Sequence, residues 1–248
     1  MDWFNVGSLI IVTWVVVAFC IPDWRKVVWP KLEQEKAFQH IVLASFFLIT
    51  VLWSAQAGVK EGLQIHFLAL TTLTMMYGWR MAFLLSIPAM IAYHWIHDIS
   101  FILLPSSLVL SALVPILISY LVFLLSYHYL PRNIFVFIFV AGFFNGALTG
   151  SLHLVFNSFY HLLVGHYDWE TIQHNYFIFV PLLAFPEGLL NGMSLAVLTV
   201  FKPEWLRVFS DRDYIYNHYH KSRYSSYLVY HAVAEFDNSC HFFILNMC

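Results

Sequence analysis

Residues 185–193 read FPEGLLNGM and place Glu187 within an apolar run that extends from Asn175 to Val200. A run of this length is sufficient to cross the hydrocarbon core of a bilayer. A carboxylate near the middle of a membrane helix is costly, so it normally faces a partner, a cavity or a transported solute. Glu187 is therefore the first candidate for a functional residue.

The residues around Glu187 favour close packing against another element. Pro186 removes a backbone donor, which kinks or interrupts a helix. Gly188 and Gly192 are four residues apart, so they leave a strip without side chains on which a neighbouring helix or loop can approach. We therefore predict that this segment is a kinked wall inside a helix bundle and not a lipid-facing anchor.

The composition of the whole chain is that of an integral membrane protein. Of its 248 residues 60% are hydrophobic and only 10% are charged, and the mean hydropathy is +0.71. The formal charge of −2 gives no reason to expect nucleic acid as a partner. The three cysteines, Cys20, Cys240 and Cys248, lack the spacing of a zinc site or a disulfide framework.

Seven apolar runs predict an all-α integral membrane protein, built as a bundle of about seven transmembrane helices within the lipid bilayer. The runs are Phe4–Ile21, Phe38–Ala57, Gly62–Gly78, Met81–His97, Ser106–His128, Asn133–Leu163 and Asn175–Val200. The first run is preceded by Asp2 and followed by basic residues, the reverse of a signal peptide, so its N-terminus is predicted to be outside. The helices form a predicted domain over residues 1–210, and residues 211–248 are expected to be a poorly ordered cytoplasmic tail.

The basic residues give an independent test of this topology. With seven crossings, eleven of the twelve Lys and Arg residues fall on one side of the membrane, and only Lys60 falls on the other. The eleven are Arg25, Lys26, Lys31, Lys36, Arg80, Arg132, Lys202, Arg207, Arg212, Lys221 and Arg223. By the positive-inside rule the N-terminus is outside, the C-terminus is inside, and the chain is a multi-pass protein of the inner (plasma) membrane.

Seven of the thirteen histidines fall in the predicted outer half of the bundle or in the loop beyond it. They are His66, His94, His97, His153, His161, His166 and His174. An outer vestibule rich in imidazole suits a borderline transition metal such as nickel, cobalt or zinc. A histidine in a membrane helix can equally be a hydrogen-bonded packing residue, and Glu187 can equally be a strut between helices, so both interpretations stay open.

Two segments resemble a known family. FPEGLLNGMSLAVLTVFKPEWL, at residues 185–206, resembles the last membrane helix of the cobalt/nickel substrate-binding membrane component of energy-coupling-factor ABC transporters. GLQIHFLALTTLTMMYGW, at residues 62–79, is similar to that family's histidine-containing helix, which ends in a Gly-aromatic turn. Leu113–Tyr120 and Leu130–Gly146 fill the pattern between them, and the resemblance covers about residues 1–214.

The resemblance implies a seven-helix protein, one helix added before a six-helix core, that captures a divalent metal, cobalt or nickel, from the outside. The implied partners are a transmembrane coupling protein and ATPase subunits. The implied metal ligands are the N-terminal amine of Met1 and the imidazole of His66. The family has a histidine after its initiator Met, whereas this chain has Asp2, whose carboxylate would be an oxygen ligand. Residues expected to orient the ligands or to gate the path are Glu187, Asn191, His94 and His153.

No Walker loop, Gly-x-Gly-x-x-Gly or Gly-x-Ser-x-Gly motif occurs, so the chain is expected to be a transporter subunit and not an enzyme. Metal is expected as cargo, with no permanently bound cofactor. One alternative is a membrane metalloenzyme of the histidine-box type, such as a lipid desaturase. The histidine clusters of such enzymes usually lie on the cytoplasmic face, whereas the pair His94 and His97 is predicted to lie outside. The other is a structural helix-packing accessory protein.

Overall fold

Six helical stretches in the described residues are long and apolar enough to cross a membrane. They are Trp3–Gln34, Lys36–Ser54, Leu70–Ile96, Phe101–Tyr129, Ile134–Val164 and Trp169–Phe201. The computed structural model describes residues 3–60, 63–165, 167–175, 177–210 and 214. The predicted helical bundle is confirmed, whereas the predicted count of seven membrane helices is not. Apart from Tyr214, the predicted tail over residues 211–248 lies outside the described residues.

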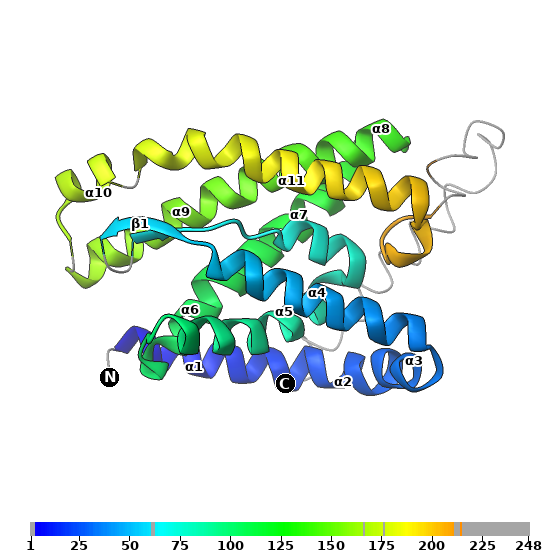
Figure 1. Cartoon of the computed structure of the whole chain (residues 1–248), viewed down its shortest axis with the longest axis horizontal. Coiled ribbons are helices and arrows are strands. Elements are labelled where there is room, and N and C mark those ends of the chain that lie inside the picture. The colour runs from blue at the N-terminus through cyan, green and yellow to red at the C-terminus, as the bar shows by residue number, and fades with distance from the viewer. Residues whose placement is uncertain (1–2, 61–62, 166, 176, 211–213, 215–248) are drawn as a thin grey trace, which may run out of the picture. The chain divides into compact units, whose positions relative to one another are not determined.

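Shorter elements make up these stretches, and Figure 1 shows their arrangement in the helical unit that ends at Phe209. The helices are α1 (Trp3–Val15), α2 (Ile21–Asp23), α3 (Trp29–Gln34), α4 (Lys36–Ser54), α5 (Leu70–Ile96), α6 (Leu104–Leu108), α7 (Val114–Tyr129), α8 (Ile134–Val136), α9 (Asn145–Val164), α10 (Trp169–Asn175) and α11 (Val180–Phe201). The strands are β1 (Ala57–Lys60) and β2 (Leu63–Ile65). The hairpin, α6, α10 and the start of α1 lie at one end of this unit, and α2, α3 and the end of α11 lie at the other (Figure 1).

Wide turns of π-helical geometry join several of these helices. Within the described residues they occupy Val16–Cys20, Trp24–Val28, Val109–Leu113 and Phe137–Phe144. Each of the first three ends two residues before a proline, namely Pro22, Pro30 or Pro115. Proline has no N–H to offer the carbonyl four residues earlier, so the helix locally widens there without ending.

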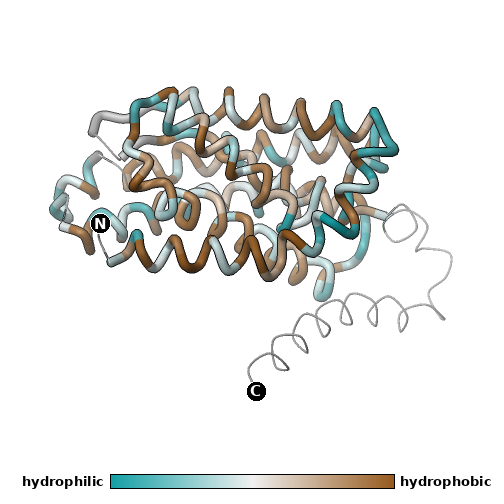
Figure 2. The backbone as a smooth tube through the Cα atoms, turned by 90° about the horizontal axis from the view of Figure 1, so that it is seen from below, coloured by the Kyte–Doolittle hydropathy of each residue, from teal (hydrophilic) through white to brown (hydrophobic). Residues whose placement is uncertain are grey.

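Apolar side chains cover the outside of the bundle. Large apolar residues of α1, α4 and α11 are exposed, among them Leu48 and Leu182 at 66% and 67%. Figure 2 shows the hydrophilic residues mostly at the two ends of the helical unit, with apolar residues along its length. Exposed apolar surface of this extent fits contact with lipid and not with water.

Helix α11 approaches α9 and the π-helical segment Phe137–Phe144 before it along glycines. A Cβ atom at Gly188 would lie 2.7 Å from the carbonyl oxygen of Phe143, and one at Gly192 would lie 3.0 Å from the Cβ of Phe143. The predicted close approach at both glycines is therefore confirmed. The partner surface, which was not predicted, includes Gly146 and Gly150 on α9, where an added Cβ would lie within 3 Å of side chains of α11.

The third predicted span, Gly62–Gly78, is not a helix over its whole length. Its first residues belong to an antiparallel hairpin in which Ala57 of β1 pairs with Ile65 of β2. Helix α5 begins only at Leu70, after an irregular segment. The sequence pattern failed here because an apolar run satisfies the hydropathy criterion whether its backbone is extended or helical.

Gly78 divides α5 into two arms, residues 70–77 and 79–96. Gly78 has φ +76° and ψ 163°, a conformation that only glycine adopts readily. The ring centroid of His66, before the first arm, lies 5.6 Å from that of Tyr93, in the second arm. A straight helix between them would separate them by roughly 40 Å at about 1.5 Å per residue, so the chain reverses its direction at Gly78.

An ion-pair network secures this reversal. Asp23 is buried, and its carboxylate oxygens lie 3.5 Å from Nη1 of Arg80 and 3.2 Å from Nη1 of Arg207. Arg207 also donates from Nη1 to the carbonyl of Tyr77 at 3.2 Å, and its backbone N–H donates to the carbonyl of Met76 at 3.1 Å. The chain after α11 is therefore bound to the end of the 70–77 arm.

Candidate functional site

Glu187 of α11 is almost fully buried, with 1% of its surface exposed. Its Oε2 accepts a hydrogen bond from the backbone N–H of Leu68 at 3.0 Å, and its Oε1 accepts one from the N–H of Ala69 at 2.8 Å. Asn191, one turn further along α11, donates from Nδ2 to Oε1 of Glu187 at 2.9 Å. The two polar side chains predicted on this helix therefore contact each other and the segment that precedes α5.

These hydrogen bonds cap the N-terminus of the 70–77 arm inside the bundle. The first N–H groups of a helix have no partner within the helix, and unpaired groups are very costly at membrane depth. Oδ1 of Asn191 accepts from both the N–H and the hydroxyl of Thr72, at 2.9 and 2.8 Å, so the capping extends into the first turn. A carboxylate at this position also faces the positive end of the helix dipole.

The connection formed by residues 66–69 is held from two sides. The carbonyl of Leu68 accepts a hydrogen bond from Nε1 of Trp53 on α4 at 3.1 Å, while the N–H of the same residue is bound to α11. Ala69 has φ +51°, in the left-handed region, which costs about 1–2 kcal/mol for a residue with a side chain. Such a backbone persists only where the surrounding contacts over-determine it.

His66 stands at the start of this connection with its ring buried. The neighbouring ring centroids are those of Tyr93 at 5.6 Å, His153 at 5.9 Å and Trp53 at 6.0 Å. Its Nδ1 is buried and has no hydrogen-bond partner. A buried polar atom without a partner is unfavourable, so this nitrogen is a natural point for a ligand to bind.

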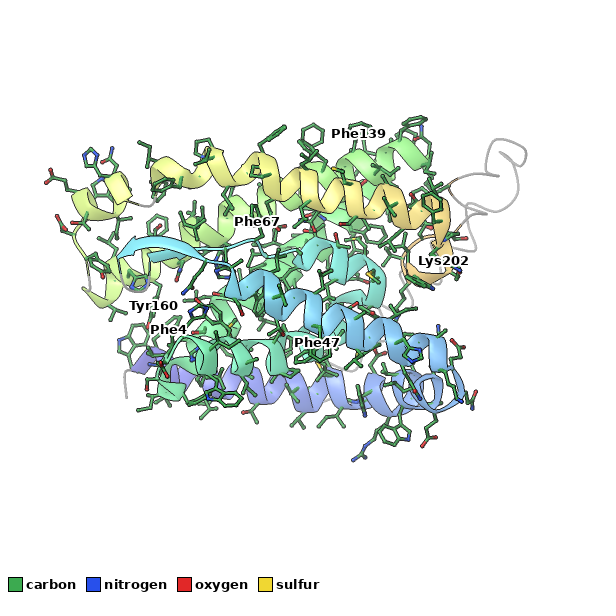
Figure 3. The ribbon with its side chains drawn as sticks, in the orientation of Figure 1. Phe4, Phe47, Phe67, Phe139, Tyr160 and Lys202 are labelled. Carbon is green, nitrogen blue, oxygen red and sulfur yellow. The ribbon has the colours of Figure 1, made fainter. Side chains whose placement is uncertain are left out.

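A cavity of about 140 Å³ adjoins the His66 ring. It is lined by His66, Met90, Tyr93, Ile99, Leu103, Ser106, Ser107, Leu110, Ser111, His153, Asn157, Tyr160 and His161. Figure 3 labels Tyr160 of α9, whose ring centroid lies 4.9 Å from that of Phe4, near the start of α1. No carboxylate is among the described residues that line the cavity. Its polar lining consists of imidazole, hydroxyl and amide groups.

The structure brings His66 and His153, both predicted from the sequence, to the same cavity. Glu187 and Asn191 do not line it. They contact the backbone of the segment that follows His66, so any influence on the cavity passes through the position of that segment. His66 and His153 thus line the cavity, whereas Glu187 and Asn191 hold the segment that follows His66.

The remaining predicted residues have other positions. His94 is fully buried, with its ring centroid 6.1 Å from that of Phe101, and it does not line the cavity. Met1 and Asp2 lie outside the described residues. Among the residues that the structure does describe, no three His, Cys, Asp or Glu side chains lie close enough together to hold one metal ion.

Two polar features beside the cavity were not among the site residues named from the sequence, although their histidines, His161 and His97, were placed in the predicted outer vestibule. His161 lines the cavity two helical turns beyond His153, and their spacing of eight residues is the signal that places both on one face of α9. The hydroxyl of Tyr93 donates to Oε1 of Gln56 at 2.6 Å, and Nε2 of Gln56 lies 2.9 Å from Nδ1 of His97. This second feature joins α5 to the end of α4, far apart in sequence, so no local spacing indicates it.

Comparison with known proteins gives one match. A family model described as the cobalt uptake substrate-specific transmembrane region, CbiM, matches residues 2–205. No curated protein and no solved structure matches the chain. The matched residues include every element that forms the cavity and its supporting hydrogen bonds, and they make up most of the chain. The chain therefore belongs to the family of the substrate-specific transmembrane region of cobalt uptake systems.

Proposed function

We propose that the chain binds the metal ion for an energy-coupling-factor transporter, as its substrate-capturing membrane component. Family membership makes it a cobalt uptake membrane component. The observation that carries the finer assignment is the buried, unpaired Nδ1 of His66 beside a cavity with further imidazoles and no described carboxylate. Nitrogen donors suit cobalt and nickel, whereas magnesium and calcium prefer oxygen ligands.

The proposal takes the remaining ligands from the start of the chain. Phe4 packs against Tyr160, so the beginning of α1 lies beside the cavity. The N-terminal amine of Met1 and the carboxylate of Asp2 are assigned as ligands on this ground, together with His66. The Asp2 carboxylate would supply negative charge to a site whose described lining has none.

Glu187 and Asn191 act in this proposal by positioning and not by direct ligation. They bind the N–H groups of Leu68, Ala69 and Thr72, which follow His66 closely in the chain. A helix that begins inside the bundle is a recurring way to build a solute site at membrane depth. The cap fixes where the polypeptide changes from extended to helical, and with it the position of the imidazole.

The proposed orientation has the cavity facing the outside. Arg80 and Arg207 lie with Asp23 at the end of the bundle away from the hairpin, and by the positive-inside rule this end faces the cytoplasm. In this topology the hairpin and the 70–77 arm together make the third of seven crossings. The chain is then a multi-pass protein of the inner membrane with its N-terminus outside.

The energy for uptake comes, in this proposal, from a transmembrane coupling protein and ATPase subunits. The sequence has no nucleotide-binding motif of its own. Nickel is the second metal to consider, because imidazole and amine donors bind it at least as well as cobalt.

Substitution of His66 tests this proposal. Purified wild-type protein should retain about one Co²⁺ per chain after desalting, and His66→Ala should retain none while eluting as the same monodisperse species. Cells that express the chain with its coupling protein and ATPase subunits should accumulate ⁵⁷Co, and cells without the ATPase subunits should not.

His40→Ala is the matched control, because His40 is an exposed histidine outside the cavity. Its metal content should equal that of the wild type. Wild-type cobalt retention in His66→Ala would overturn the proposal and leave His66 as a packing residue.

A further inference from the structure

His153 of α9 lines the same cavity as His66 and is 2% exposed. Its Nδ1 lies 3.4 Å from the carbonyl oxygen of Leu110, a contact in which the ring donates its proton. A ring that donates from Nδ1 carries its lone pair on Nε2. A hydrogen bond from the far nitrogen to a backbone carbonyl is also the usual way in which a metal-binding imidazole is oriented.

The two imidazoles have a separation suited to sharing one ion. Their ring centroids are 5.9 Å apart and their planes are inclined at 64°. Two imidazoles that bind one metal ion through bonds of about 2 Å hold their centroids roughly 5–6 Å apart. Nδ1 of His66 is buried without a hydrogen-bond partner, and a metal ion bound at this nitrogen would compensate for its burial.

The cavity has room for an ion and its remaining ligands. Its volume is about 140 Å³, and a water molecule occupies about 30 Å³. Ser106 and Ser111 add hydroxyl groups to the lining, which are suitable partners for waters bound to the ion. The hydroxyl of Ser106 donates to the carbonyl of Leu103 at 2.8 Å, and its oxygen can still accept from such a water.

One side chain sets the distance between the two imidazoles. Glu187 accepts the N–H of Ala69, three residues after His66. Its Cγ lies 2.9 Å from the position of a Cβ at Gly150, three residues before His153. The same side chain therefore abuts the backbone that carries each ring, and neither wall can move without disturbing it.

From this geometry we propose that His153 is a direct ligand of the transported divalent cation and binds it together with His66. The inference rests on the proposed function, since it concerns the site at which the cargo is captured. It predicts that a bound Co²⁺ ion has two imidazole ligands from different walls of the cavity, one from the connection before α5 and one from α9.

Cobalt K-edge X-ray absorption on tag-free protein with half an equivalent of Co²⁺ tests the proposal. The wild type should show two imidazole ligands and His153→Asn should show one, whereas His66→Asn should bind cobalt too weakly to give a protein-bound spectrum. Cobalt affinity should fall at least about 10-fold in His153→Asn. His40→Asn makes the same replacement at an exposed histidine and should leave the imidazole count and the affinity unchanged.

Chemical rescue separates a ligand from a packing residue. His153→Ala enlarges the cavity, and added imidazole should restore cobalt binding to this variant. The control His40→Ala should bind cobalt as the wild type does, with or without imidazole. Size-exclusion elution and the thermal midpoint without metal show whether each variant is folded. Failure of imidazole to restore binding to a folded His153→Ala would overturn the ligand assignment.

The outcomes distinguish this inference from the proposed function. If the wild type binds cobalt through one imidazole that is lost only in His66→Asn, the proposed function stands and His153 is not a ligand. If the wild type binds no cobalt, both fail.

Discussion

Glu187 is buried in a membrane helix and binds two backbone N–H groups as well as one side chain. Both of its oxygens accept N–H groups of the connection before α5, and Asn191 supports one of them. The strut that the sequence left open as one interpretation is present as hydrogen bonds to backbone, and a functional role for Glu187 stays a proposal. Glu187 joins two segments, and one of them carries His66.

Replacement of Glu187 tests the value of this cap. Glu187→Ala leaves the N–H groups of Leu68 and Ala69 unpaired, at about 1–3 kcal/mol each, so the thermal unfolding midpoint in detergent should fall clearly. Glu187→Gln keeps one acceptor oxygen and should cause a smaller fall. Glu204 is exposed, so Glu204→Ala serves as the control and should leave the midpoint unchanged. Equal midpoints for all three variants would refute the capping role.

At the scale of elements, glycines determine how closely α9 and α11 pack against each other. Gly146 faces Asn191, and Gly150 faces Glu187, so the glycines of α9 lie against the two polar residues of α11. Small residues let helices approach closely in a membrane, where apolar side chains gain little by leaving lipid. Glu187 and Asn191 therefore face the glycines of α9 and not lipid.

Gly146→Ala should destabilise this contact. The new Cβ would lie 2.8 Å from Cβ and 2.9 Å from Nδ2 of Asn191, so one helix must shift, at a cost of about 1–3 kcal/mol. Gly7→Ala is the control, because no atom lies within 4 Å of a Cβ there and alanine favours a helix over glycine. We expect a reduced folded yield and a lower unfolding midpoint for Gly146→Ala alone. A midpoint for Gly146→Ala at or above that of Gly7→Ala would contradict the close approach.

The sequence was a good guide to helices and a poor one to the connection between the hairpin and α5. Apolar runs locate the helices because lipid requires apolar surface of fixed length. The start of α5 at Leu70 depends on Glu187, which is more than a hundred residues away, and no local pattern contains that information. For the same reason His66 and His153 are each visible as candidates, while their proximity is not.

At the scale of the whole chain, cysteine labelling tests the proposed orientation in the membrane. A cysteine at Glu170, exposed on α10, should react with an impermeant maleimide in intact cells. A cysteine at Glu33, exposed on α3, should react only after permeabilisation. Both are introduced after the three native cysteines are replaced by serine. The reverse labelling pattern would invert the proposed topology and place the cavity on the cytoplasmic side.

The 70–77 arm is fastened at both ends to one stretch of polypeptide. Its beginning is bound by Glu187 and Asn191 of α11, and its end by Arg207, just beyond α11. The arm and α11 are therefore expected to move together as one unit. A displacement of the end of α11 by a neighbouring subunit would therefore be transmitted to His66 through hydrogen bonds. Hydrogen bonds have a defined length and direction, whereas contacts between apolar side chains can rearrange.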